Sequence, residues 1–203
     1  MDPFAALGVA AAFLIGVTGH EFLTHLAAAS QGDQAPRFQR RVTLDLRQHA
    51  DPFGTWVLGI GFSVLVLLGT PMPFWFAYGK PHALAPSYQS RRGPRRWIPL
   101  VGPAFTLALA ALVGHLANSL SPGAIRTVLQ FATITFLYLS AIELLPLPGR
   151  DGGRLLATAL SPQAAMKMEE LRVYEGLFVV GIFLIFPGAV RTVTDLLASV
   201  LQL

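Results

Sequence analysis

The sequence predicts an all-α polytopic membrane protein, built as a helical bundle with a broken or re-entrant hairpin after the first helix. Of the 203 residues, 53% are hydrophobic and only 13% are charged. The apolar residues form runs too long for the core of a soluble protein of this size. No hydrophilic stretch between the runs is large enough for a second domain, so residues 1–203 are expected to form a single membrane domain.

Four apolar runs are each near or above the ~20 residues that cross a hydrocarbon core as a helix. They cover residues 4–29, 53–79, 97–118 and 123–147. A fifth run, 176–190, is shorter, and it would reach full length only if the Leu-rich tail after Arg191 continued it. Asp195 makes that tail amphipathic, which predicts an interfacial position instead. The amino terminus lacks the basic start of a secretory signal, so the first run is expected to be a retained span.

Positive charges predict the orientation, because short loops rich in Lys and Arg stay cytoplasmic. Thirteen of the fifteen Lys and Arg fall in three loops, which are all expected on the cytoplasmic side. These loops hold Arg37, Arg40, Arg41 and Arg47; Lys80, Arg91, Arg92, Arg95 and Arg96; and Arg150, Arg154, Lys167 and Arg172.

The run from Phe53 to Gly79 joins the first two of these loops, so it is expected to enter the membrane and return. Pro71 and Pro73 supply the break, because each lacks an N–H and obstructs a helical turn. The returning backbone has to lie against protein or water, since lipid offers no hydrogen bonds. The alternative is an ordinary kinked span with one cationic loop outside.

The composition limits the chemistry of any site. A net charge of +4 can indicate nucleic-acid binding, but here Lys and Arg lie between apolar runs, so no nucleic-acid partner is expected. The chain has no Cys, which excludes disulfides, thiolate metal sites and cysteine nucleophiles. A metal would have to bind histidines and carboxylates.

Ionisable residues inside apolar runs are costly and by default indicate a functional site. The first run carries His20, Glu21 and His25, and the fourth carries Glu143, with Asp151 just beyond its end. Neither buried acid has a Lys or Arg within reach on its own helix. A bound cation would neutralise them.

The first of these groups resembles the zincin arrangement, in which His-Glu is followed by a second His one helical turn later. Here His20 and His25 are five apart, which on a regular helix leaves their side chains roughly 140° apart and puts Thr24 beside His20. A local π-bulge would bring His25 onto the metal-binding face. Alternatively, the helix stays regular and Glu143 or water completes the metal sphere, or His25 merely approaches the cytoplasmic interface.

The second group lies on the turn from residue 143 to residue 154. Two prolines end the helix, and the paired glycines after Asp151 let backbone approach closely. Asp151 is thereby presented on a constrained turn. Taken alone, the segment also fits a helix-terminating loop with a solvated Asp.

Together these residues resemble the site-2 proteases, a family of intramembrane zinc metalloproteases, and specifically the short bacterial type without a PDZ domain. The resemblance runs almost end to end. Its ordered motifs are His20-Glu21, the stretch His49-Ala50-Asp51-Pro52-Phe53-Gly54-Thr55, Gly79-Lys80-Pro81, Arg91 to Gly102-Pro103, and Leu145-Pro146 to Asp151-Gly152-Gly153.

The resemblance implies that His20 and Asp151 bind Zn²⁺ and that Glu21 is the general base. It also implies a bacterial cytoplasmic membrane, and the loop charges put the carboxyl ends of the first and fourth runs, with the site, near the cytoplasmic side. The substrate implied by the resemblance is a transmembrane helix of another membrane protein, locally unwound; a strand-like surface near the 80–96 loop would hold it extended.

Three positions depart from the family pattern. The second histidine of the family aligns with Thr24, and its two asparagines align with Thr106 and Glu143. Either His25 or Glu143 is then the remaining metal ligand, or the chain is a relative that has lost turnover.

Three functions therefore compete. The first is a zinc-dependent intramembrane endopeptidase, and the second is a catalytically silent relative that binds membrane helices without cleaving them. The third is a transporter or channel that uses Glu21 and Glu143 as an ion relay, which leaves the Pro-rich turn unexplained. Of the other histidines, His49 and His82 lie in loops that can adjoin the site, but each is expected as a polar surface residue. His115 is expected as a packed or interfacial residue. No feature indicates an oligomeric state.

Overall fold

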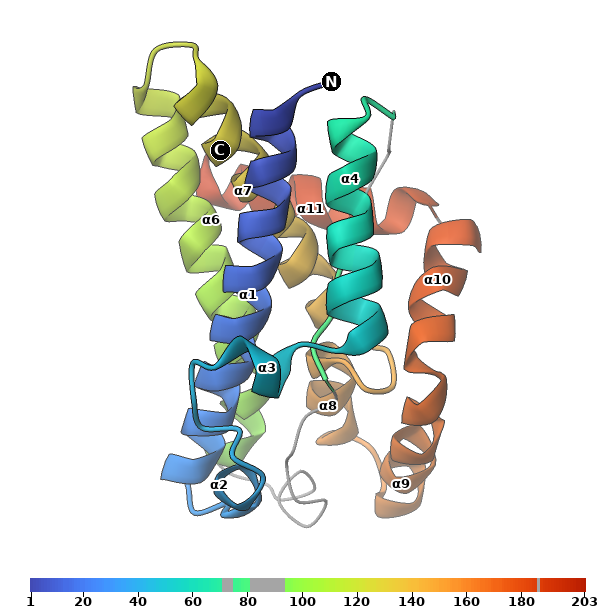
Figure 1. The fold of residues 1–203 in the computed structure, drawn as a ribbon. Helices are drawn as coiled ribbons and strands as arrows, with labels where there is room; N and C mark the ends of the chain where they lie inside the picture. Colours follow the sequence, from blue (N-terminus) through green and yellow to red (C-terminus); the bar gives the residue numbers. More distant parts are fainter. Residues whose placement is uncertain (71–74, 81–93, 186) are drawn as a thin grey trace.

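The computed structural model describes residues 1–70, 75–80, 94–185 and 187–203. Three helices in this part of the chain are long and apolar enough to cross a membrane: Pro3–Ser30, Trp97–Ser119 and Ala124–Leu144. The predicted all-α membrane bundle is confirmed. Figure 1 shows the long helices side by side, with the shorter ones gathered at one end and one flank.

The described chain is helical apart from its connections and one extended segment. Its elements are α1 (Pro3–Ser30), α2 (Ala35–Phe38), α3 (Leu46–His49), the π-helical η1 (Pro52–Ile60), α4 (Gly61–Leu67), the 3₁₀-helical η2 (Pro94–Leu100), α6 (Val101–Ser119), α7 (Ala124–Leu144), α8 (Asp151–Ala157), α9 (Pro162–Glu170), the 3₁₀-helical η3 (Leu171–Tyr174), α10 (Glu175–Ile185) and α11 (Pro187–Leu201).

Helix α1 is the central element of the bundle. It begins at Pro3, where the Asp2 carboxylate accepts hydrogen bonds from the backbone N–H groups of Phe4 and Ala5. Gly8 faces α7 so closely that a Cβ there would lie 2.3 Å from the Val128 carbonyl oxygen. Small residues at such contacts let membrane helices pack backbone to backbone. The core between the helices contains Val9, Phe13, Val17, Phe136, Leu139 and Ile142.

The apolar run of residues 53–79 begins as a helix, and the described part of its return, from residue 75, is extended. The chain ascends through η1 and α4, and Ala50 and Gly79 form an isolated antiparallel bridge at the foot of the two arms. The Nζ atom of Lys80 donates to the carbonyl of Arg47 over 2.9 Å, so both ends of the run lie at the same end of the bundle. The break predicted at Pro71 and Pro73 lies outside the described residues, and the re-entrant course in a membrane stays a prediction.

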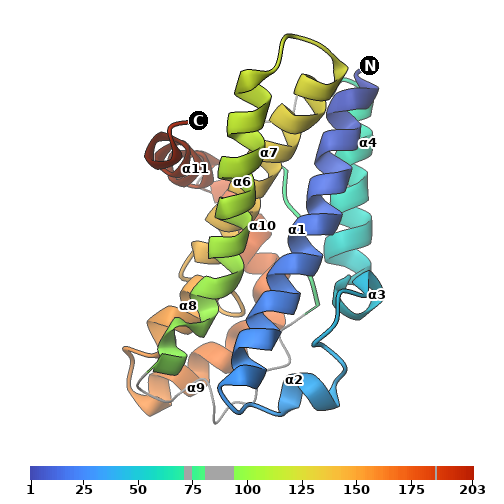
Figure 2. The same ribbon diagram turned by 90° about the vertical axis from the view of Figure 1, so that its left-hand side faces the viewer.

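Both views place the connections at two opposite ends of the molecule. The amino terminus, the far end of α4 and the α6–α7 loop lie at one end, and α2, α8 and α9 lie at the other (Figures 1 and 2). For the described parts of the cationic loops, this separation agrees with the predicted grouping. Which end faces the cytoplasm stays a prediction.

The fifth apolar run is divided between two helices. Helix α10 runs from Glu175 to Ile185 along one flank, and α11 lies crosswise to the bundle and packs on α7 (Figures 1 and 2). Helix α10 has 11 residues, too few to span by itself, and the tail does not extend it, because α11 runs crosswise. The interfacial position of α11 stays a prediction.

The absence of cysteine from the chain permits a direct test of the hairpin. We expect Arg47→Cys and Lys80→Cys to react with a membrane-impermeant maleimide from one side of the membrane, and Ser121→Cys from the other. Labelling would be compared in intact cells and inside-out vesicles. Reaction of Arg47→Cys and Lys80→Cys from opposite sides would establish the kinked span instead.

Candidate metal centre

Two residues from opposite parts of the chain meet at the centre of the candidate site. His20 lies on α1 and Asp151 is the first residue of α8, and 2.9 Å separates His20 Nε2 from Asp151 Oδ2. His20 is 4% exposed and Asp151 is 0% exposed. The alternative of a solvated Asp151 in a helix-terminating loop is therefore wrong.

The turn between α7 and α8 fixes Asp151 by close backbone packing. Gly149 has a positive φ of 88°, a conformation that side chains with a Cβ rarely adopt. A Cβ on Gly153 would lie 1.9 Å from the carbonyl oxygen of Leu147. The paired glycines thus let α8 start directly against the turn, which carries Asp151 into the bundle.

Glu143 joins His20 and Asp151. One ligand atom from each of these three buried residues lies within 4.8 Å of the others. Glu143 also accepts a 2.6 Å hydrogen bond from Arg150 Nη1, a partner from beyond its own helix that the sequence did not predict. Arg150 in turn pairs with Glu175.

The two buried arginines set the charge of the site. Burial alone would lower the pKa of Arg150, but Glu143 and Glu175 hold it above its ordinary value. Burial lowers the pKa of Arg154, although Asp151 opposes the shift from 3.7 Å away. These two guanidinium groups face the carboxylates of Glu143, Glu175 and Asp151, which leaves one negative charge among these five groups. A proton on His20 or a bound cation balances it.

The donor set fits zinc. A catalytic zinc site has three nitrogen, oxygen or sulfur ligands from the protein and one open position, and His20, Glu143 and Asp151 offer one imidazole and two carboxylates. Tetrahedral zinc with ligand bonds of ~2.0 Å separates its donors by roughly 3.3 Å. His20 and Asp151 would therefore move apart by a few tenths of an ångström to accept the ion.

A small cavity adjoins this centre. It is lined by His20, Glu21, Thr106 and Glu143 together with the extended segment at Ala77 and Gly79. Its 10 Å³ of space for the centre of a water molecule is about enough for one water. Thr106 bonds Ser140 across α6 and α7 over 2.6 Å. The two positions where the family has asparagine thus line the same cavity as the proposed base.

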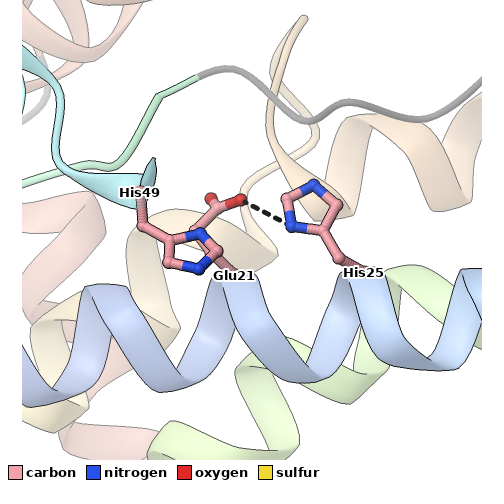
Figure 3. A group of neighbouring side chains, drawn as sticks. All are labelled: Glu21, His25 and His49. Atoms are coloured by element: carbon pink, nitrogen blue, oxygen red, sulfur yellow. Dashed lines mark ion pairs between the residues drawn. The ribbon is translucent and has the colours of Figure 1, made fainter. Parts of the chain in front are cut away.

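His25 belongs to a different group. Helix α1 is a regular α-helix through this region, without the π-bulge that would have turned His25 toward His20. Instead His25 Nδ1 lies 3.8 Å from Glu21 Oε2, one turn earlier (Figure 3). The structure therefore brings Glu143, and not His25, together with His20 and Asp151.

The expectation for His49 is wrong. It is 0% exposed and lies beside Glu21 and His25, because the bridge of Ala50 with Gly79 draws its loop against α1 (Figure 3). The sequence did contain a signal that His49 lies near the site, because His49 is the first residue of the motif at residues 49–55. His82 and most of the 80–96 loop lie outside the described residues.

Several known proteins similar to this chain share one description, zinc metalloprotease. The protein named putative zinc metalloprotease YwhC of Bacillus subtilis is 30% identical over 168 residues, covering 79% of this chain and 73% of its own length. The putative zinc metalloprotease Rip2 of Mycobacterium tuberculosis is 29% identical over 192 residues, covering 91% of this chain and 71% of its own. Rip2 of Mycolicibacterium smegmatis is 27% identical over 188 residues.

The chain belongs to the site-2 protease family. No family model and no solved structure matches it. As a site-2 protease it is a membrane protein of a zinc metalloprotease family, which agrees with the spans and with the donor set of His20, Glu143 and Asp151.

Gly102 provides a test of the His20 position in this site-2 protease. A Cβ at Gly102 would lie 2.4 Å from Cε1 of the His20 ring, which is buried and held by Asp151. We expect Gly102→Ala to displace the ring and weaken zinc binding at least ~10-fold, the size of effect seen when the support of a metal ligand is lost. Zinc affinity would be measured by competition with a chelating dye.

The control for this substitution is Gly61→Ala, where the described residues leave the added methyl group without a contact within 4 Å. It should leave zinc affinity unchanged. Equal affinity in the two variants would show that the His20 ring does not contribute to the metal site.

Arg150 provides a test of the charge balance. Removing one partner of a buried ion pair costs ~3–5 kcal/mol, so Arg150→Gln should lower the thermal midpoint of the metal-free protein in detergent. Because Glu143 is then released, zinc should raise the midpoint more than it does in wild type. The control is Arg172→Gln, which breaks the half-exposed pair with Glu169 and should cost at most ~1 kcal/mol. A zinc shift smaller than in wild type would exclude Glu143 as a ligand.

Proposed function

We propose that this site-2 protease is a zinc-dependent intramembrane endopeptidase that cleaves transmembrane segments of other membrane proteins. The observation that carries the proposal is the buried contact of His20 with Asp151, with Glu143 beside both. Ionisable residues are costly inside a membrane bundle, so three of them converging on one point indicate a functional centre.

Residues of this chain would have two roles, binding the metal ion and transferring a proton. His20, Asp151 and Glu143 would hold the ion, and zinc bound there supplies a Lewis acid that polarises a carbonyl and acidifies water. Glu21 follows His20 on α1 and lines the same cavity. Its carboxylate would accept the proton of the attacking water and pass it to the departing amine.

The extended segment supports a binding mode for the substrate. Ala77 and Gly79 line the cavity that holds His20 and Glu21, so an extended peptide beside them would reach the proposed base. Edge-strand addition binds peptides in this way through their backbones. The cavity accepts about one water, so the helices and this segment would have to part before a peptide enters.

A catalytically silent relative is the second candidate. Two observations favour it: Thr24 replaces an imidazole of the family pattern, and Arg150 already pairs with Glu143. The guanidinium of Arg150 speaks against the third candidate, an ion relay, because a fixed positive charge at Glu143 would repel a passing cation.

The proposal predicts that Glu21→Gln still binds zinc at the His20 centre but loses cleavage by ~10²-fold or more, because the amide cannot accept the proton. Cleavage of a panel of fluorogenic transmembrane peptides would be followed in proteoliposomes, and zinc by elemental analysis. The matched control is Glu169→Gln, a surface acid on α9 whose loss should change neither.

The same experiment distinguishes the alternatives. Zinc without cleavage of any peptide in wild type would favour the silent relative. Absence of zinc at saturating metal would contradict the proposal, and proton or cation flux through the proteoliposomes would then identify the relay.

A further inference from the structure

We propose that Glu21, His25 and His49 form a second divalent-cation site, suited to Zn²⁺ or another ion that takes imidazole and carboxylate ligands. One ligand atom from each residue lies within 4.8 Å of the others, a limit that the His20 group also meets. Glu21 is 4% exposed, and both histidines are 0% exposed. Figure 3 shows Glu21 and His25 rising from α1 while His49 comes down on them from α3.

The hydrogen bond of His49 orients its ring for metal binding. Its Nε2 atom lies 2.7 Å from the carbonyl oxygen of Thr43, which can only accept a hydrogen bond. Nε2 must therefore carry the proton, which leaves the lone pair of the neutral ring on Nδ1. Histidines that bind metals usually donate their other N–H to a carbonyl or carboxylate in this way.

The lone pair on Nδ1 of His49 is available to bind a metal ion. The Nδ1 atom is buried and has no hydrogen-bond partner among the described residues. Burial lowers the pKa of His49, which favours the neutral ring that a metal requires, while the Thr43 carbonyl and Glu21 act in the opposite direction and Arg41 adds to the lowering. Buried polar atoms without partners are rare, and a metal-ligand role accounts for this one.

The backbone around His49 is held firmly enough to keep the site assembled. Its carbonyl accepts a 2.7 Å hydrogen bond from the N–H of Lys80, and the next residue bridges Gly79. The His25 and His49 rings stack with centroids 5.9 Å apart and planes inclined by 21°. The three ligands thus come from two elements that are tied together, which is the preorganisation that a metal site needs.

This group is separate from the His20 centre. The two groups share no residue, and successive side chains on an α-helix point roughly 100° apart, so His20 and Glu21 face different directions. Glu21 nevertheless links the two sites, because it would be a ligand in one and the proton acceptor beside the other. If the proposed protease function holds, an ion on Glu21 would occupy the base and inhibit cleavage at high zinc concentration.

Metal content of the purified full-length protein tests the second site. We expect wild type to bind two zinc ions, and His49→Gln and Asp151→Asn to bind one each. His115→Gln removes an exposed imidazole from α6 and is the matched control, which should keep both ions. Helical circular dichroism and elution volume of each variant would be compared with wild type.

The outcomes separate this inference from the proposed function. One ion in wild type that is lost in Asp151→Asn and kept in His49→Gln would overturn the second site alone. One ion that is lost in His49→Gln and kept in Asp151→Asn would support this site and contradict zinc at His20. No bound zinc in any variant would overturn both.

Two measurements complete the test. Zinc X-ray absorption on the wild-type protein needs no variant, so misfolding of a variant cannot affect it. If both sites bind zinc, three histidines serve two ions, an average of one and a half imidazole ligands per ion. If only the His20 centre binds zinc, the average is one. In the peptide assay, inhibition by excess zinc should move to at least tenfold higher concentration in His49→Gln and stay in place in His115→Gln. An average of one imidazole per zinc, or unchanged inhibition in His49→Gln, would overturn the proposal.

Discussion

The buried contact between His20 and Asp151 is the interaction on which the rest of this structure depends. An imidazole and a carboxylate removed from water are tolerated only when a proton or a cation balances them. Glycines on both sides make that contact possible. The paired glycines let α8 start inside the bundle, and Gly102 leaves room for the His20 ring. A hydrophobic pair would stabilise a membrane bundle more simply, so the presence of an ionisable pair here indicates a functional site.

Much of the fold follows from one-dimensional patterns. Apolar runs gave the three spans within a few residues of their bounds, because a helix is the simplest way to satisfy backbone hydrogen bonds in lipid. The return of the chain after α4 was expected from the loop charges, and the bridge between Ala50 and Gly79 agrees with it. The extended form of that return could not be predicted, since it depends on contacts such as the 2.8 Å hydrogen bond from Trp75 to Thr135.

Site residues that belong to a local motif or stand out within an apolar run could be identified from the sequence. Residues that join the site only through contacts between distant parts of the chain could not. His20, Glu21, Glu143 and Asp151 stood out as ionisable groups in or beside apolar runs. Arg150 did not, because it counted as one of several loop cations, and only the folded turn shows it against Glu143. His49 was assigned to the surface for the same reason, although it lies buried on Glu21. The π-helical geometry that was considered for α1 occurs in η1 instead.

The central claim is that a divalent ion binds between His20 and Asp151. Anomalous scattering from crystals grown with zinc, recorded on both sides of the zinc absorption edge, tests it most directly because it locates the ion independently of activity. The account predicts a peak within bonding distance of His20 Nε2 and a carboxylate oxygen of Asp151. Well-ordered side chains at the direct 2.9 Å contact, with no zinc peak on either, would contradict it.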